Sequence, residues 1–204
     1  MSNSKALKSI SEYYNNLVEK YGHDPRSCDY GHANSQKIKF SVLSEATGYD
    51  NKSVLDIGCG FADYCSFLTA GFENVNYTGV DISEGMIKQA KAQHPDIQIE
   101  LKNVFEDPFD KKFDVVTSNG IFYLLGANAQ QLMFTFITKM FAMAEEVVAF
   151  NSLSTWANDQ VASEFYADPS ETMEFCRQLT PWVTLRHDYH PRDFTIYMYK
   201  NRNI

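Results

Sequence analysis

Residues 53–68 read SVLDIGCGFADYCSFL, and this stretch decides the predicted fold. The apolar run Val54–Ile57 predicts a buried strand, which ends at a Gly-Cys-Gly turn over residues 58–60 where the backbone must turn without large side chains. A helix is expected to begin near Ala62. Such a turn lets a ligand lie against bare backbone, with the amides at the helix N-terminus facing it. The stretch therefore predicts a nucleotide-type binding site.

Asp56 places a carboxylate just before the glycines, where an apolar residue would be ordinary. An acid at this turn would repel the pyrophosphate of a dinucleotide but would attract a cationic ligand. Residues 56–62, DIGCGFA, resemble motif I of the class I S-adenosylmethionine (SAM)-dependent methyltransferases, an acid followed by Gly-x-Gly-x-Gly, with Ala62 in place of the third glycine. In that family the glycine turn passes under the methionyl part of SAM, whose ammonium and sulfonium groups are both positive.

A second acid follows the next expected strand. Asp81 lies 21 residues after Gly60, close to the ~20 expected for a carboxylate that accepts hydrogen bonds from ribose hydroxyls. The alternative is that Asp81 only caps the following helix, although Ser83 could fill that role alone. Asp56, the glycines and Asp81 together favour the methyltransferase family.

The bulk properties of the chain fit one domain. A chain of 204 residues that is 44% hydrophobic can bury a single core. We predict one domain over residues 1–204, with an N-terminal helix and lid over residues 1–34 and a Rossmann-like core over residues 35–204.

The charge and the cysteines restrict the partners and the setting. The net charge of −8 provides no basic field for a nucleic acid, so a small-molecule partner is favoured. The four scattered cysteines are expected to be reduced thiols, and no run approaches the ~20 apolar residues of a membrane span. We therefore expect a soluble, cytoplasmic monomer or homodimer without a membrane partner.

Alternating strand and helix patterns predict parallel βαβ units. Strands are expected over residues 54–57, 75–80, 97–101, 113–118 and 146–151, and helices over residues 4–20, 35–47, from 62, from 83, over 130–144 and over 168–179. The chain should end in a hairpin of residues 182–189 and 194–199, divided by a turn that contains Pro191. The expected fold is α/β, a Rossmann-like doubly wound sheet of seven mostly parallel strands, and the resemblance implies an antiparallel last strand and the order 3-2-1-4-5-7-6.

The first 34 residues combine an amphipathic helix with a loop rich in tyrosine, histidine, glycine and proline. In small-molecule members of the family, an N-terminal helix and loop fold over the cofactor as a lid, and residues 13–32 occupy the corresponding place. The alternative is a surface helix followed by a disordered loop.

The resemblance also implies cofactor contacts beyond the two acids. Asn103 offers an amide carbonyl where the family often has an acid for the adenine amino group. Val104 and Phe105 could sandwich the adenine, or they could simply be core residues. The full set of expected cofactor-binding residues is Tyr14, Tyr21, Asp56, Gly58, Cys59, Gly60, Asp81, Ile82, Met86, Asn103, Val104, Phe105 and Asn119.

The fourth strand exits into residues 118–121, SNGI. The nucleic-acid and glutamine N-methyltransferases of the family carry an Asn/Asp-Pro-Pro-aromatic run here, and both prolines are missing. The resemblance therefore implies the small-molecule branch. The Met- and Phe-rich helix over residues 130–144 is expected to be packing material.

Methyl transfer requires alignment and exclusion of water, and a protonated acceptor must also lose a proton. A histidine suits that task at neutral pH. His187 and His190 are the candidates, as a base held by a neighbouring carboxylate, as part of a metal site, or as a solvated turn. In an extended strand the two rings point to opposite faces, which disfavours a metal site, so no metal is expected.

Two other functional classes could contain a glycine turn of this kind. An NAD(P)-dependent oxidoreductase would need a glycine at position 63, where this chain has aspartate. A non-catalytic SAM-binding or partner-binding module remains open. The predicted function is methyl transfer from SAM to an oxygen or nitrogen atom of a metabolite or natural product, with the acceptor unspecified.

Overall fold

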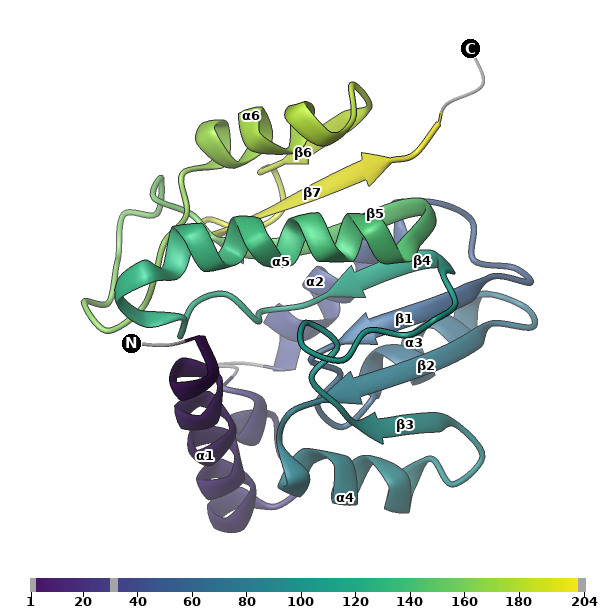
Figure 1. Cartoon of the computed structure of the whole chain (residues 1–204). Helices are drawn as coiled ribbons and strands as arrows, with labels where there is room; N and C mark the ends of the chain where they lie inside the picture. The colour runs from purple at the N-terminus through teal and green to yellow at the C-terminus, as the bar shows by residue number, and fades with distance from the viewer. Residues whose placement is uncertain (1–2, 30–32, 202–204) are drawn as a thin grey trace.

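The computed structural model describes residues 3–29 and 33–201, and its centre is a seven-stranded sheet. The strands lie in the order β3-β2-β1-β4-β5-β7-β6, as predicted (Figure 1). Strand β7 is antiparallel to both β5 and β6, and the other neighbouring strands are parallel. The strands are β1 (Ser53–Ile57), β2 (Asn76–Asp81), β3 (Gln98–Leu101), β4 (Phe113–Ser118), β5 (Ala144–Leu153), β6 (Val183–Arg186) and β7 (Asp193–Tyr199).

Helices cover both faces of the sheet, which confirms the doubly wound prediction (Figure 1). The helices are α1 (Asn3–Tyr21), η1 (Pro25–Cys28), α2 (Ala33–Ser44), α3 (Asp63–Gly71), α4 (Glu84–Gln93), η2 (Gly126–Asn128), α5 (Ala129–Met143) and α6 (Pro169–Leu179). Residues of α5 and α6 pack in one hydrophobic cluster on one face, and residues of α2, α3 and α4 pack in another on the opposite face. Among the described residues, no helix is long and apolar enough to cross a bilayer.

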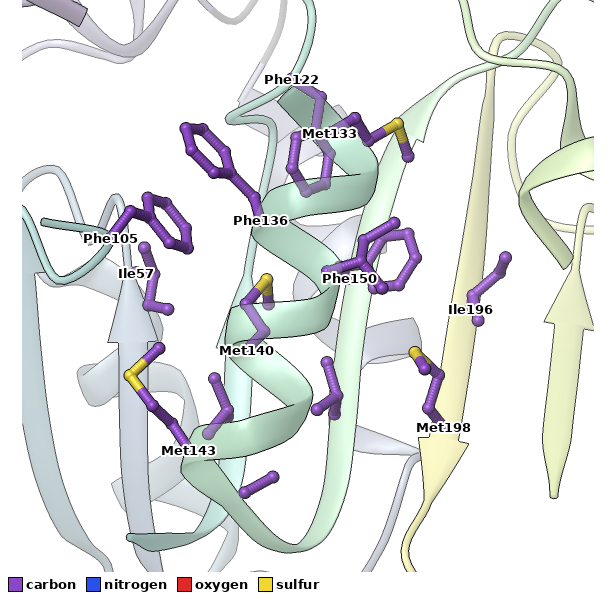
Figure 2. Close-up of a cluster of buried hydrophobic side chains, with 14 of the residues drawn as sticks. Ile57, Phe105, Phe122, Met133, Phe136, Met140, Met143, Phe150, Ile196 and Met198 are labelled. Atoms are coloured by element: carbon purple, nitrogen blue, oxygen red, sulfur yellow. The ribbon is translucent and has the colours of Figure 1, made fainter. Parts of the chain in front are cut away.

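Helix α5 contributes seven buried residues to one core, in line with the packing role that its composition predicted. Figure 2 shows Met133, Phe136, Met140 and Met143 directed from the helix toward the sheet. All four are buried, and each methionine can adapt its shape to gaps between branched strand residues.

Two element ends differ from the predictions because tertiary contacts decide them. Helix α2 stops at Ser44, short of the predicted end at residue 47, and the hydroxyls of Tyr49 and Tyr197 donate to the carbonyls of Leu43 and Val42. Buried hydroxyl donors thus satisfy carbonyls at the end of this helix. Strand β6 ends at Arg186, four residues from the His190 turn, which places His187 outside the ladder.

The N-terminal helix is docked on the N-terminus of α4. The Ser11 hydroxyl donates to the carbonyl of Ile82 at 2.7 Å. The side-chain oxygen of Asn15 accepts from the Ser83 hydroxyl at 2.8 Å and from the Gly85 amide at 2.9 Å. Helix α1 is therefore fixed beside the carboxyl end of β2.

Candidate cofactor and acceptor site

A cavity of about 450 Å³ opens at the carboxyl ends of the central strands, between α1, α2 and the loop after β4. This is the edge at which open α/β sheets bind ligands. His190 and all the predicted cofactor residues except Tyr21 line it, namely Tyr14, Asp56, Gly58, Cys59, Gly60, Asp81, Ile82, Met86, Asn103, Val104, Phe105 and Asn119.

The glycine turn presents bare backbone to this cavity. Gly58 has φ +73°, and a Cβ on it would lie 2.4 Å from Cγ2 of Ile121, so a side chain would be excluded by both conformation and space. The amides of Gly58 and Cys59 donate to the carbonyl of Val80 at 2.8 and 3.0 Å. The turn is thus tied to β2, and α3 begins after Ala62, itself left-handed at φ 62°.

Asp81 connects the two motifs. Its Oδ2 accepts from the Gly60 amide at 3.0 Å and its Oδ1 accepts from the Ser83 amide at 2.8 Å. The helix cap itself is Ser83, whose hydroxyl accepts from the Met86 amide. Burial raises the pKa of Asp81, although hydrogen bonds from the backbone amides of Ser83, Gly60 and Ile82 lower it. Each carboxylate oxygen retains a lone pair for a ligand hydroxyl.

Asp56 lies deeper than a strand-end acid, since β1 continues to Ile57. It is 3% exposed and accepts a 2.5 Å hydrogen bond from the Tyr77 hydroxyl. Burial raises the pKa of Asp56 to about 7, although the Tyr77 hydrogen bond opposes the shift. A cation in the adjoining cavity would favour the ionised form.

The segment after β3 forms the other wall of the cavity. Val104 and Phe105 are buried, and the Phe105 ring stacks on Phe136 with centroids 3.8 Å apart. Asn103 uses its side-chain oxygen to accept from the Phe105 amide at 3.1 Å. One lone pair of the Asn103 oxygen therefore stabilises the local turn. The stacked rings of Phe105 and Phe136 belong both to the core and to the cavity wall.

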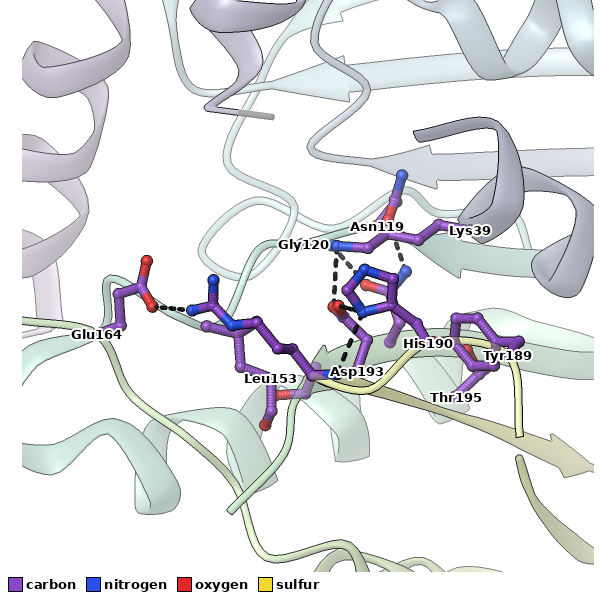
Figure 3. A network of polar contacts seen from close by, with 12 residues as sticks. Lys39, Asn119, Gly120, Leu153, Glu164, Tyr189, His190, Asp193 and Thr195 are labelled. Carbon is purple, nitrogen blue, oxygen red and sulfur yellow. Dashed lines mark hydrogen bonds and ion pairs between the residues drawn. The ribbon is translucent and has the colours of Figure 1, made fainter. Parts of the chain in front are cut away.

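The turn between β6 and β7 brings a histidine and a carboxylate together in the wall of the same cavity, close to Asn119 and Gly120 (Figure 3). Nδ1 of His190 is 2.7 Å from Oδ2 of Asp193, and Oδ1 of Asp193 is 2.9 Å from Nζ of Lys39. The Arg192 amide also approaches Nδ1, at 3.2 Å. We assign the ring proton to Nδ1, because the shorter contact to a carboxylate is the stronger hydrogen bond. Nε2 is then the basic nitrogen.

Comparison with known proteins shows that part of this sequence is similar to methyltransferases. A family model for a methyltransferase domain matches residues 54–142. A Mycobacterium tuberculosis protein, provisionally named a methyltransferase, is 25% identical over 158 residues, 74% of this chain and 95% of that protein. A provisionally named methyltransferase of Invertebrate iridescent virus 6 is 31% identical over 90 residues, 41% of this chain, and the match spans 34% of its length.

A solved structure extends the similarity to the whole fold. Magnesium protoporphyrin IX methyltransferase of Synechocystis PCC 6803 with bound SAM has a TM-score of 0.70 and 12% identity, covering 96% of this chain and 97% of that one. Residues 54–142 belong to the methyltransferase-domain family, and the chain as a whole has the class I methyltransferase fold. Enzymes of this family take their methyl group from SAM.

Within this methyltransferase fold, the two candidate histidines have different surroundings. His187 is not among the residues that line the cavity; its Nε2 lies 2.7 Å from the Ser154 hydroxyl and its ring packs against Trp156. The geometry therefore favours His190 over His187 as a base. Among the described residues, no group of three or more His, Cys, Asp or Glu side chains could hold a metal ion.

Tyrosine hydroxyls connect the N-terminal segment to the loop after β4, which lines the cavity. The hydroxyls of Tyr14 and Tyr123 are 2.6 Å apart, and Tyr123 donates to Oδ2 of Asp29 at 2.9 Å. Tyr13 donates to the same oxygen at 3.1 Å. Tyr21 does not share this arrangement, because its ring contacts the Lys20 and Arg26 cations outside the cavity.

Several residues at the cavity were missed in the sequence. Lys39, Tyr123 and Asp29 carried no motif, and nothing in their spacing indicates that they meet partners from distant segments. Asp193 was visible only as a neighbour of the histidines. His32, which the lid hypothesis included, lies outside the described residues.

Proposed function

We propose that the protein binds SAM over the 58–60 turn and transfers its methyl group to an oxygen or nitrogen atom of a small-molecule acceptor. The observation that carries the proposal is that the His190–Asp193 pair opens into the same cavity as the glycine turn and Asp81. A ligand-positioning turn and a proton acceptor thus share one space.

The residues of the turn fit the donor. When bound, SAM supplies an electrophilic methyl group on a positively charged sulfur. Asp81 would accept from the ribose hydroxyls, and the bare backbone at Gly58 and Gly60 leaves room for the methionyl part. Asp56 provides a counter-charge that ionises near neutral pH. The cavity walls keep water from competing as an acceptor.

At the turn between β6 and β7, His190 would take the acceptor's proton on Nε2. Asp193 holds Nδ1–H, which fixes the tautomer and stabilises the imidazolium that forms. The residues that line the cavity also include Leu7 and Ile10 of α1 and Leu153 at the end of β5. An acceptor with an apolar body and one ionisable hydroxyl or amine fits these surroundings.

Asp81→Ala tests the donor site. The variant loses the carboxylate proposed for the ribose, and SAM affinity should fall by about 1.5–3 kcal/mol, the range for hydrogen bonds to a charged group. Titration calorimetry with SAM and S-adenosylhomocysteine measures the change. Asp96→Ala, at an exposed position beyond α4, is the matched control. Unchanged affinity in a folded Asp81→Ala protein would refute the assignment.

Tyr123→Phe tests the lid. The variant removes the hydroxyl that lies between Tyr14 and Asp29, so α1 should open more often. We expect SAM to dissociate several-fold faster, in line with roughly 1 kcal/mol per lost hydrogen bond. Stopped-flow release of SAM gives the rate. Tyr13→Phe, which loses only an exposed contact with Asp29, should change it less, and equal rates in all three proteins would contradict a lid.

A non-catalytic SAM-binding module is the second candidate. It would bind SAM at the same turn but would leave the methyl group in place. Incubation with methyl-labelled SAM and a metabolite extract distinguishes the two, because only an enzyme produces a labelled small molecule. Identification of that molecule would also reveal the acceptor atom.

A further inference from the structure

Lys39 lies at the acceptor end of the cavity, although it comes from α2 and is far from His190 in the sequence. The residue is 9% exposed, and its ammonium contacts Oδ1 of Asp193 at 2.9 Å. Oδ2 of the same carboxylate contacts Nδ1 of His190. One buried carboxylate therefore lies between a lysine cation and the proposed base (Figure 3).

We propose that Lys39 is a positioning residue that keeps His190 unprotonated and correctly oriented at neutral pH, acting through the shared carboxylate of Asp193. This inference rests on the proposed function, in which His190 accepts a proton. An imidazole that is already protonated cannot take the acceptor's proton. A contact that keeps the His190 imidazole unprotonated before the acceptor binds therefore increases the rate of methyl transfer.

The electrostatic argument starts from Asp193, which is 3% exposed. A buried carboxylate with a histidine as its single charged neighbour would strongly favour the imidazolium. Lys39 already balances that negative charge, so a proton on His190 would place a second cation on one carboxylate. Interactions between charges are strong at such buried sites. Burial would raise the pKa of Asp193, but the His190 hydrogen bond and the Lys39 charge lower it, so the carboxylate stays ionised.

The orientation argument concerns the same three residues. Lys39 holds one oxygen of Asp193, which limits rotation of the carboxylate and directs the other oxygen at Nδ1. With Nδ1–H fixed, Nε2 keeps its lone pair for a ligand in the cavity. Removal of the ammonium would release both restraints together.

The other charged groups around His190 do not replace Lys39. Arg192, in the same turn, directs its guanidinium at Glu164, with Nη2 2.8 Å from Oε2. The hydroxyls of Tyr189 and Thr195 are 2.8 Å apart. Burial raises the pKa of Tyr189, so this side chain stays neutral. Lys39 is thus the cation on the carboxylate that holds the ring.

The test uses the full chain with Lys39→Met, and with Lys39→Arg as the variant that conserves the charge. The first readout is an NMR titration of the His190 imidazole in the SAM-free protein, assigned with His190→Gln. In Lys39→Met we expect the midpoint to move to higher pH by roughly one unit or more. Lys39→Arg should keep the wild-type midpoint, and Lys39→Met combined with Asp193→Asn should cancel the shift.

The second readout is the pH profile of methyl transfer from labelled SAM into a metabolite extract. The acid limb should move to higher pH in Lys39→Met, with turnover recovered in alkaline buffer, whereas a merely structural role would lower turnover at every pH. A shifted NMR midpoint with an unmoved profile would support the Lys39 coupling and would exclude His190 as the base. An unmoved midpoint overturns the inference, and Lys39→Gln gives the same decision if Lys39→Met does not fold.

Discussion

Replacement of His190 by alanine should lower methyl transfer by roughly 10²–10⁴-fold, the range for loss of a general base. SAM affinity should stay at the wild-type level, because the donor is expected to contact the 58–60 turn and Asp81, not His190. The reason for the large effect is that, of the histidines that the structure describes, His190 is the one that lines the cavity, and its Nδ1 is held by Asp193. Turnover of labelled SAM and titration calorimetry on the same preparation measure the two quantities.

His187→Ala is the matched control for this experiment. His187 is close in sequence, but its Nε2 contacts the Ser154 hydroxyl and its ring packs under Trp156. Its loss should leave turnover within a few-fold of wild type at every pH. If His187→Ala were the inactive variant and His190→Ala the active one, the base would be His187 after all.

Asp56→Asn should make the ligand-free protein more stable at alkaline pH while weakening its hold on SAM. The pKa of Asp56 is raised by burial to about 7, against 3.8 for an ordinary aspartate. Because folding raises the pKa of this carboxyl group, its stabilising contribution is fully present below the pKa of about 4 in the unfolded chain. The contribution is lost as the pH rises from about 4 to about 7. Asparagine does not ionise, so the free energy of unfolding should rise by roughly 2–4 kcal/mol near pH 8 and change little near pH 4.

Urea unfolding at the two pH values measures this difference, and Asp96→Asn on the surface serves as the control. The same stability change at both pH values would show that Asp56 titrates normally. SAM affinity should move in the other direction, since the neutral amide no longer balances the cationic donor. In the wild type, affinity should therefore increase as the pH rises through about 7, with release of a proton on binding.

The residues proposed to bind SAM were predicted from local sequence. The turn at residues 58–60 needs glycine because of its left-handed backbone and the nearness of Ile121, and this requirement is visible as a motif. Asp81 was predicted from its place at a strand end and from its spacing to Gly60. It accepts from the amides of Gly60 and Ser83, and its role toward a ribose stays a prediction. The strand order came from the resemblance and is confirmed, since periodicity cannot distinguish one order of parallel strands from another.

The acceptor half depended on contacts between distant segments. Lys39 reads in the sequence as an ordinary lysine of an amphipathic helix, and only the packing of α2 beside the start of β7 brings it to Asp193. The choice between His187 and His190 likewise follows from where β6 leaves the ladder, which pairing with β7 decides. The sequence by itself determined the alternation of strands and helices and the glycine turn, because steric limits on the backbone and the alternation of apolar runs are local. Only the tertiary structure decided which base, carboxylate and cation meet, because burial and long-range pairing leave no local pattern.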